Sequence, residues 1–150
     1  MKTISGIDGY KELAGQPLGE SEWIEIDQDR INRFADATGD HQWIHVDVER
    51  AKQGPFGTTI AHGFLTLSLI PSLTGGLLKV DGVRMGINYG LNKVRLPNPV
   101  RVGSRVRASV RNLTVEDVQG GIQIVNEVTV SIDGEPKPAC VAETVTRLYV

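Results

Sequence analysis

The feature of the sequence that most limits the possible folds is an apolar segment near its middle. Residues 58–73 are expected to form a helix, and its core, 60–70, carries apolar side chains on nearly every side. A helix that is apolar all round is a buried helix. Pro71 is expected to kink or end it. The remainder of the chain must therefore supply a surface that surrounds this helix.

The second half of the chain has the pattern of such a surface. Several segments alternate apolar and polar residues or are β-like, as strands with one buried face are. They are 83–94, 105–115, 122–132 and 139–149. Gly120-Gly121 and Asp133-Gly134 are hairpin signals between them, and Gly90 indicates a bulge. We therefore expect an α+β hotdog fold, in which a curved antiparallel sheet wraps around one central helix, with residues 1–150 as a single domain.

The first half is expected to hold shorter elements. Asp27 is a candidate N-cap for a helix over 28–37, and Gly39 is its expected stop. Asp47 is a candidate cap for a second short helix over 48–53. Two further elements are expected, a short helix at 10–14 and a short strand at 23–26.

The composition limits which binding partners and which cellular compartment are expected. Sixteen basic and eighteen acidic residues give a net charge of -2, without the basic excess that a nucleic-acid-binding protein needs. The apolar stretches are too short and too interrupted to span a bilayer, and no secretory signal is visible. Cys140 is the only cysteine, so no internal disulfide can form. We expect a cytoplasmic protein without a membrane or nucleic-acid partner.

All three histidines of the chain lie in one short window, together with Asp40. Asp40 and His45 are five residues apart, and a carboxylate and an imidazole can share acid and base roles in adding or removing water. Gly63 follows His62 where the central helix can begin, so its free N–H could hold a thioester oxygen. Spacing alone leaves a second interpretation open, in which all of these are ordinary loop and packing residues.

Two other interpretations are weaker. His41 and His45 have the i, i+4 spacing of helical zinc ligands, but Gly39 and the Trp43-Ile44 pair argue against a continuous helix there. A basic stripe on the strands could meet the phosphates of coenzyme A, or could be a solvated face that protects a strand edge. Its members are Arg101, Arg105, Arg107 and Arg111.

Two motifs together resemble the signature of the MaoC-like, (R)-specific enoyl-CoA hydratases. Residues 34–47 contain Gly39-Asp40 followed by His45, and residues 56–65 contain Ile60-Ala61-His62-Gly63 at the expected distance. The stretch 88–100 resembles the short, nodulation-protein-N-like branch of this family. The resemblance covers nearly the whole chain.

The resemblance implies a hotdog homodimer with Asp40 and His45 as the catalytic pair. It implies that the Gly63 N–H binds the thioester carbonyl, and we expect Gln42 and His62 to contact substrate. It implies no metal and no redox cofactor, because coenzyme A enters only as part of the acyl-CoA substrate. The chain departs from the family pattern at Gln42-Trp43, where Asn-Pro is common, and at Pro71.

The expected activity is reversible addition of water to trans-2-enoyl-CoA, which gives (3R)-3-hydroxyacyl-CoA. The alternative in the same reaction class is a (3R)-hydroxyacyl-ACP dehydratase of fatty-acid synthesis. A hotdog thioesterase and a non-catalytic acyl-thioester-binding module are the alternatives outside that class.

Overall fold

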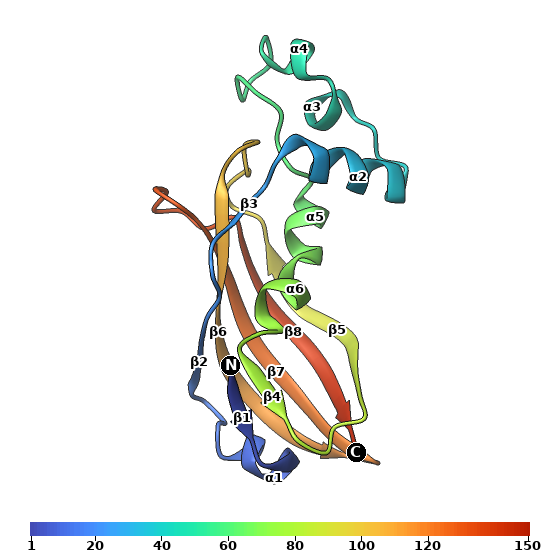
Figure 1. Ribbon diagram of the computed structural model, residues 1–150, viewed down its shortest axis with the longest axis vertical. Coiled ribbons are helices and arrows are strands. Elements are labelled where there is room, and N and C mark those ends of the chain that lie inside the picture. Colours follow the sequence, from blue (N-terminus) through green and yellow to red (C-terminus); the bar gives the residue numbers. More distant parts are fainter.

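A computed structural model describes residues 1–150, and in it a six-stranded antiparallel sheet curves around a short pair of helices (Figure 1). The strands follow the order β2-β6-β7-β8-β5, and the short β3 also pairs with β6. Their bounds are β2 Pro17–Glu20, β3 Ile24–Glu25, β5 Met85–Arg95, β6 Arg105–Val118, β7 Gly121–Ile132 and β8 Cys140–Tyr149. The expected curved sheet around a central helix is confirmed.

The helices fall into three groups (Figure 1). At one end of the sheet, α1 lies beside a small parallel sheet made of β1 and β4; α5 and α6 line the inner face, and α2, α3 and α4 extend beyond the other end. The bounds are β1 Lys2–Ile4, α1 Gly6–Lys11, α2 Gln28–Thr38, α3 Trp43–Val46, α4 Val48–Ala51, α5 Gly63–Ser68, α6 Ile70–Thr74 and β4 Leu78–Val80. None of these helices has both the length and the apolar character needed to cross a membrane.

The central helix is shorter than the sequence predicts, and it is divided in two. Residues 58–62 are not helical, and Ile60 within them forms a β-bridge with Arg101. The helical run breaks at Leu69. Pro71 lies in the first turn of α6, where its missing N–H costs no intrahelical hydrogen bond. The helix is therefore interrupted next to Pro71, as one of the two expected outcomes, but it continues as α6 rather than ending there.

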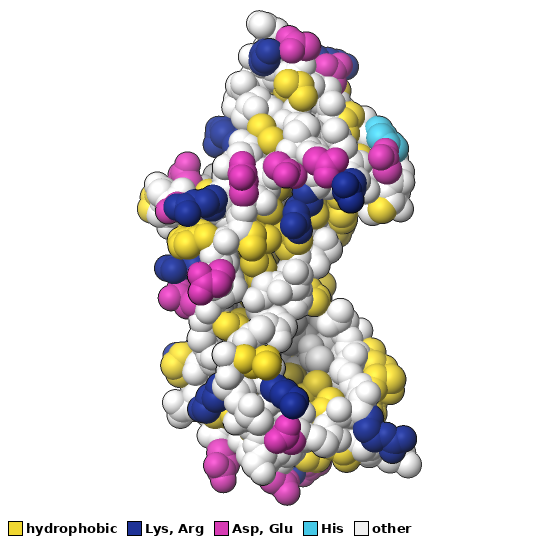
Figure 2. Space-filling view, in the orientation of Figure 1, with side chains coloured by type: hydrophobic (Ala, Val, Ile, Leu, Met, Phe, Trp, Pro, Cys, Tyr) yellow, Lys and Arg dark blue, Asp and Glu magenta, His cyan; other side chains and the backbone are white.

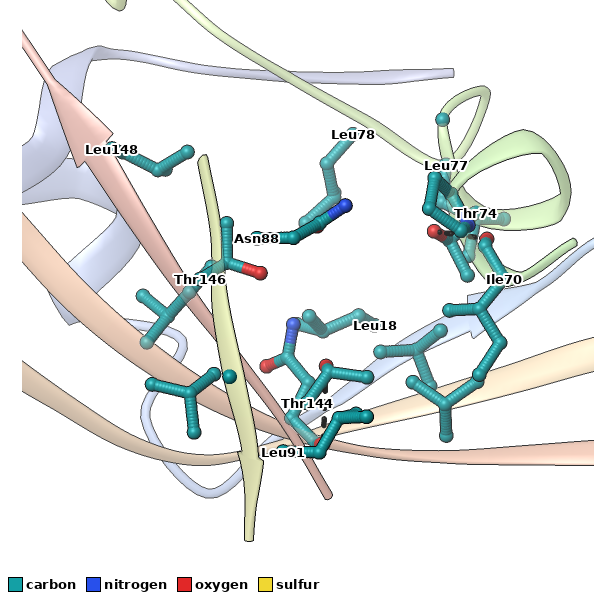
Figure 3. Close-up of a pocket in the computed structure, with 18 of the residues that line it drawn as sticks. Leu18, Ile70, Thr74, Leu77, Leu78, Asn88, Leu91, Thr144, Thr146 and Leu148 are labelled. Carbon is teal, nitrogen blue, oxygen red and sulfur yellow. Dashed lines mark hydrogen bonds between the residues drawn. The ribbon is translucent and has the colours of Figure 1, made fainter. Parts of the chain in front are cut away.

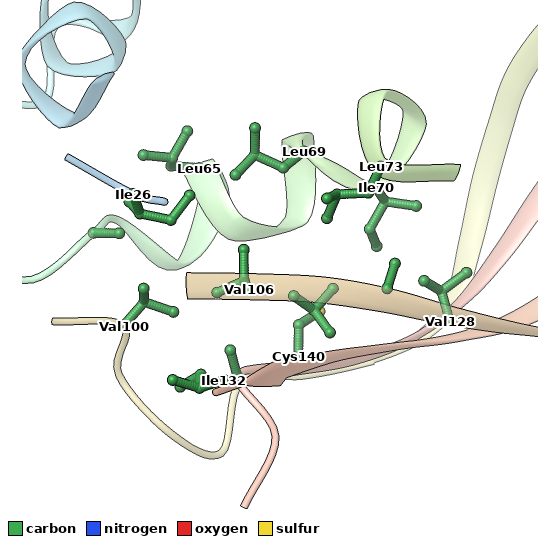
Figure 4. Packing of buried hydrophobic residues seen from close by; sticks show 14 of the residues in the cluster. Ile26, Leu65, Leu69, Ile70, Leu73, Val100, Val106, Val128, Ile132 and Cys140 are labelled. Atoms are coloured by element: carbon green, nitrogen blue, oxygen red, sulfur yellow. The ribbon is translucent and has the colours of Figure 1, made fainter. Parts of the chain in front are cut away.

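The main core lies between this helix pair and the concave face of the sheet (Figure 4). Leu65, Leu69 and Ile70 of the helices face inward-pointing side chains of the strands. The strand side chains that complete this core include Val106, Ala108, Val128, Val130, Ile132, Cys140 and Ala142. Alternation along the strands thus gives one buried face, as predicted.

Most of the local signals in the sequence are confirmed. Asp27 caps α2 by accepting a hydrogen bond from the Arg30 N–H, and Gly39 ends that helix with a positive φ of 80°. Asp47 caps α4. The helix expected at 10–14 is wrong in position, because α1 begins at Gly6 and ends at Lys11.

The hairpin between β6 and β7 depends on its two glycines. Gly120 has a positive φ of 82°, and a Cβ on Gly121 would lie 1.8 Å from the Leu148 carbonyl oxygen of β8. The neighbouring Val150 N–H donates to the Gly120 carbonyl at 3.1 Å. This glycine pair therefore allows β8 to approach the turn closely.

We expect Gly121→Ala to lower the free energy of unfolding by about 1–3 kcal/mol, because the new methyl group forces β8 away from the turn. Urea denaturation would measure the change. Gly76→Ala is the control, since a Cβ there meets no atom within 4 Å. Equal stability of the two variants would contradict the close approach of β8.

Candidate active site

His45 is held in one orientation at the end of α3. Its side chain is 6% exposed, and Nδ1 lies 2.7 Å from the carbonyl oxygen of Ile60. A carbonyl oxygen can only accept a hydrogen bond, so Nδ1 carries the proton and donates it. In the neutral ring, Nε2 is then unprotonated and free to act as a base.

The backbone around His45 is held by two polar residues that the sequence analysis did not single out. The Gln28 side-chain amide donates to the His45 carbonyl at 2.8 Å, and the Thr59 hydroxyl donates to Gln28 Oε1 at 2.5 Å. Thr59 is fully buried. Gln28 is the first residue of α2, where a polar side chain is common, so its role has no distinct sequence signal. It joins α2, α3 and the extended segment before α5.

Asp40 follows the Gly39 cap in an exposed loop. Its carboxylate accepts the Gln42 N–H at 3.2 Å, and its main-chain carbonyl accepts a hydrogen bond from His62 Nε2 at 3.0 Å. With Nε2 protonated, the neutral His62 ring leaves Nδ1 as an acceptor, and this buried atom has no partner within the protein. His62 therefore ties the loop that bears Asp40 to the start of α5.

The two buried histidines stack on each other. The ring centroids of His45 and His62 are 3.8 Å apart, with 23° between the ring planes, and Phe34 packs against His62 at 4.9 Å. One ligand-type atom from each of Asp40, His45 and His62 lies within 4.8 Å of the others. The structure thus brings together the carboxylate and the imidazole that the sequence paired, with His62 beside them.

This packing favours a neutral His45. Burial lowers the pKa of His45 below its ordinary value, the positive charge that His62 can carry lowers it further, and the hydrogen bond to Ile60 and the Asp40 carboxylate oppose the shift. His41 is the contrast, because its exposed ring lies 2.9 Å from Asp36 and this hydrogen bond raises its pKa. A base with Nε2 available at neutral pH is therefore found at His45.

The same three residues fit a metal ion poorly. Imidazole binds metals through nitrogen lone pairs that lie in the ring plane. Because His45 and His62 are stacked with nearly parallel planes, their lone pairs do not converge on one point between the rings. His45 Nδ1 and His62 Nε2 are also engaged with carbonyl oxygens. The arrangement suits proton transfer better than ligation.

Gly63 begins α5 next to His62, so no carbonyl of an earlier helical turn accepts a hydrogen bond from its backbone N–H. A Cβ at this position would lie 2.6 Å from Leu96 Cδ1, so glycine allows Leu96 to pack directly on the backbone. The next residue, Phe64, is 73% exposed. The start of the helix therefore lies at an open, apolar surface.

Other expected site residues lie elsewhere or act through their backbone. Gln42 is exposed, and it is its backbone N–H that bonds Asp40 and its carbonyl that accepts the His45 N–H at 3.0 Å. His41 pairs with Asp36, away from the stacked histidines. Two residues of the basic stripe form ion pairs, Arg105 with Asp133 and Arg107 with Glu20. The solvated-face interpretation of the stripe is favoured.

Similarity to known proteins covers most of the chain. Residues 10–134 match the family described as MaoC-like domain. The chain is 55% identical over 148 residues to 3-hydroxyacyl-thioester dehydratase Z of Mycobacterium tuberculosis, covering 98% of each protein. It is 51% identical over 136 residues to nodulation protein N of Rhizobium leguminosarum bv. viciae, covering 88% of this chain and 84% of that protein.

A solved structure shares the architecture. The (R)-hydratase from A. caviae superposes with a TM-score of 0.73 at 24% sequence identity, covering 90% of this chain and 96% of that one. At this identity the likeness concerns the fold alone. Together with the sequence matches, it shows that the chain belongs to the MaoC-like domain family, with the hotdog fold.

Proposed function

We propose that this hydro-lyase is a 3-hydroxyacyl-thioester dehydratase that removes water reversibly to form a trans-2-enoyl thioester. The observation that carries the proposal is the convergence of the Asp40 carboxylate and the neutral His45 imidazole at one end of α5. The sequence analysis gave hydration as the main activity and dehydration as its alternative. The relative at 55% identity is named as a dehydratase, which supports dehydration. Both names describe one equilibrium approached from opposite sides.

The chemistry assigns each group a role. In dehydration, the base takes a proton from C2 of the acyl chain, the C3–O bond breaks as the C2–C3 double bond forms, and the proton taken from C2 is passed to the departing hydroxyl, which leaves as water. His45 Nε2 is the available base, and Asp40 lies on the same reacting centre and shares the proton transfers. The Gly63 N–H donates to the thioester oxygen as it gains negative charge. The family resemblance supports the (3R) configuration.

His62 acts in this scheme as a positioning residue. It takes no part in the two proton transfers. Its Nε2–H donates a hydrogen bond to the main-chain carbonyl of Asp40, and its ring stacks on His45. Both catalytic side chains are thereby fixed relative to Gly63, which follows His62 in the chain. Such preorganisation is worth a large share of the rate when reacting groups must be aligned.

A homodimer is the assembly that we propose, formed through the edge strand β5. This strand pairs with β8 on one side only, so its other backbone edge is unpaired. Four large apolar side chains on it are 40–58% exposed, which is unusual for a protected edge. They are Met85, Ile87, Tyr89 and Leu91. A second copy of the chain would pair the free backbone edge and cover the apolar side chains, because its own β5 offers matching hydrogen bonds and an apolar surface.

The direct test of function uses purified protein and 3-hydroxybutyryl-CoA, with formation of the enoyl thioester followed by ultraviolet absorbance. Growth of this absorbance supports dehydration. Release of free thiol without it would indicate a thioesterase instead. Chiral analysis of the hydroxyacyl product formed from crotonyl-CoA tests the (3R) assignment.

We expect Asp40→Asn and His45→Gln each to lower kcat by about 10²–10⁴-fold, because each removes a proton-transfer group. Circular dichroism should show an intact fold in both. The controls are Asp36→Asn and His41→Gln, which alter the same residue types in the exposed ion pair next to the site. Near-normal rates in both site variants would contradict the assignment.

The acid limb of the kcat/KM profile should have its midpoint below the ordinary histidine pKa of about 6.5. The reason is that burial lowers the pKa of His45, so the base stays unprotonated until the pH falls below that value. Initial rates across a pH series measure the midpoint. A midpoint above about 6.5 would instead match His41, whose pKa is raised.

Ile87→Lys should convert the dimer to a monomer, because it places a charge in the middle of the apolar edge strand. Sedimentation velocity reports the mass. Glu116→Lys is the control, since it adds the same side chain at an exposed position on β6. A monomeric wild-type protein would refute the proposed assembly.

A further inference from the structure

A large cavity lies between α6, β4 and the concave face of the sheet (Figure 3). Its volume is about 700 Å³, within the range of small-molecule sites in proteins. None of Asp40, His45 or Gly63 lines it. In the space-filling view the molecule is hollowed at its waist, beside the helix pair (Figure 2). The cavity thus lies apart from the catalytic pair.

The cavity nevertheless begins close to the proposed thioester site. Leu67 and Ser68 are among its lining residues, and Leu67 follows Gly63 by four residues within α5. Four residues of helix rise about 6 Å, and they return to the same face. Pro71 and Thr74 carry the lining further along α6. An acyl chain held at Gly63 that followed this helix face would reach the cavity.

The two walls of the cavity differ in chemistry. The helix side and the β4 side are mostly apolar, with Leu18, Ile70, Leu77 and Leu78 around the open centre (Figure 3). The opposite wall, on the sheet, carries polar side chains where the rest of the concave face is apolar. These are Asn88, Asn126, Thr144 and Thr146.

Strand pairing places the polar side chains next to one another. Asn126 of β7 is the cross-strand partner of Thr144 on β8, and Thr146 of β8 is the partner of Asn88 on β5. The fully buried Asn112 of β6 pairs with Asn126 and donates to its side-chain oxygen at 2.8 Å. A polar band therefore crosses four strands, with a step of two residues along β8 from Thr144 to Thr146.

Several of these polar groups lack protein partners. Asn88 and Thr146 make no side-chain hydrogen bond in the structure. Tyr10 is only 3% exposed, and its hydroxyl accepts a long hydrogen bond of 3.5 Å from Asn126 but donates to no protein group. A purely apolar chain would leave these groups desolvated and unpaired, which is costly. An oxygen atom on the ligand would satisfy them.

We propose that this cavity receives the distal part of the acyl chain, and that its polar band selects chains bearing a hydroxyl or keto oxygen beyond the reacting carbons. The proposal rests on the proposed function, since the thioester must lie at Gly63. The apolar wall holds the methylene groups, while Tyr10, Asn88 and Thr146 bond the oxygen. The substrate class is then an oxygenated 3-hydroxyacyl or 2-enoyl thioester.

The test compares two long-chain trans-2-enoyl-CoA substrates of equal length, one plain and one with a hydroxyl near the distal end. We expect kcat/KM for the hydroxylated substrate to be higher by up to about tenfold, the value of one net hydrogen bond. Thr146→Val, which replaces the hydroxyl by a methyl group, should bring the ratio of the two values close to one. Thr129→Val should keep the wild-type ratio, because Thr129 lies between core residues of β7 and so points to the opposite face.

Crotonyl-CoA separates the two proposals, because its chain is too short to reach the band. If the protein hydrates crotonyl-CoA but shows no preference between the long substrates, the polar band only holds water and the cavity proposal is overturned. If neither crotonyl-CoA nor either long substrate is hydrated, the proposed function fails. Calorimetric binding of the two long thioesters would then still decide whether the cavity prefers the oxygenated chain.

Discussion

The site depends on one extended segment, residues 59–61, which is bonded on both of its edges. On one side the Ile60 N–H donates to the Ile44 carbonyl of α3, at 3.0 Å. On the other side the Ala61 N–H donates to Val100 at 2.8 Å, and the Val102 N–H donates to Thr59 at 3.0 Å. The segment thus joins the projecting helices to the sheet. The Ile60 carbonyl, in the middle of this segment, is the one that orients His45.

This constraint explains why the central helix begins late. The sequence predicts a helix from residue 58 onward because the apolar run 60–70 continues into residues that are clearly helical. A helical conformation there would turn the Ile60 carbonyl along the helix axis and take it away from His45. The lost helical hydrogen bonds are replaced by those to Ile44 and Val100, which come from distant parts of the chain. Sequence patterns record local preference, so this tertiary replacement is outside their reach.

Local signals, by contrast, were reliable. The Asp27 cap, the Gly39 stop and the bulge at Gly90 each depend on a few neighbouring residues, and each is present. The pairing of Asp40 with His45 was also accessible, because both residues belong to one recognisable motif. The role of Gln28 cannot be predicted from the sequence, because its hydrogen bonds to His45 and Thr59 join it to residues 17 and 31 positions away. The polar band cannot be predicted either. The sequence shows only that Asn126 interrupts an otherwise apolar alternation, and which polar residues lie beside it depends on the register of the strands.

The same fold therefore separates reaction from recognition. The proposed catalytic pair lies on a loop and a short helix beyond the sheet, where small sequence changes can alter chemistry without disturbing the core. His45 is kept neutral by burial against a second imidazole, and two stacked rings 3.8 Å apart resist carrying two positive charges. In the proposed scheme, recognition of the acyl chain falls to the sheet, whose concave face carries polar side chains between the main core and the apolar cluster that contains Tyr10 and Ile124. On this scheme, substitutions at a few inward-facing strand positions would change the preferred length and oxygenation of the substrate without moving Asp40 and His45.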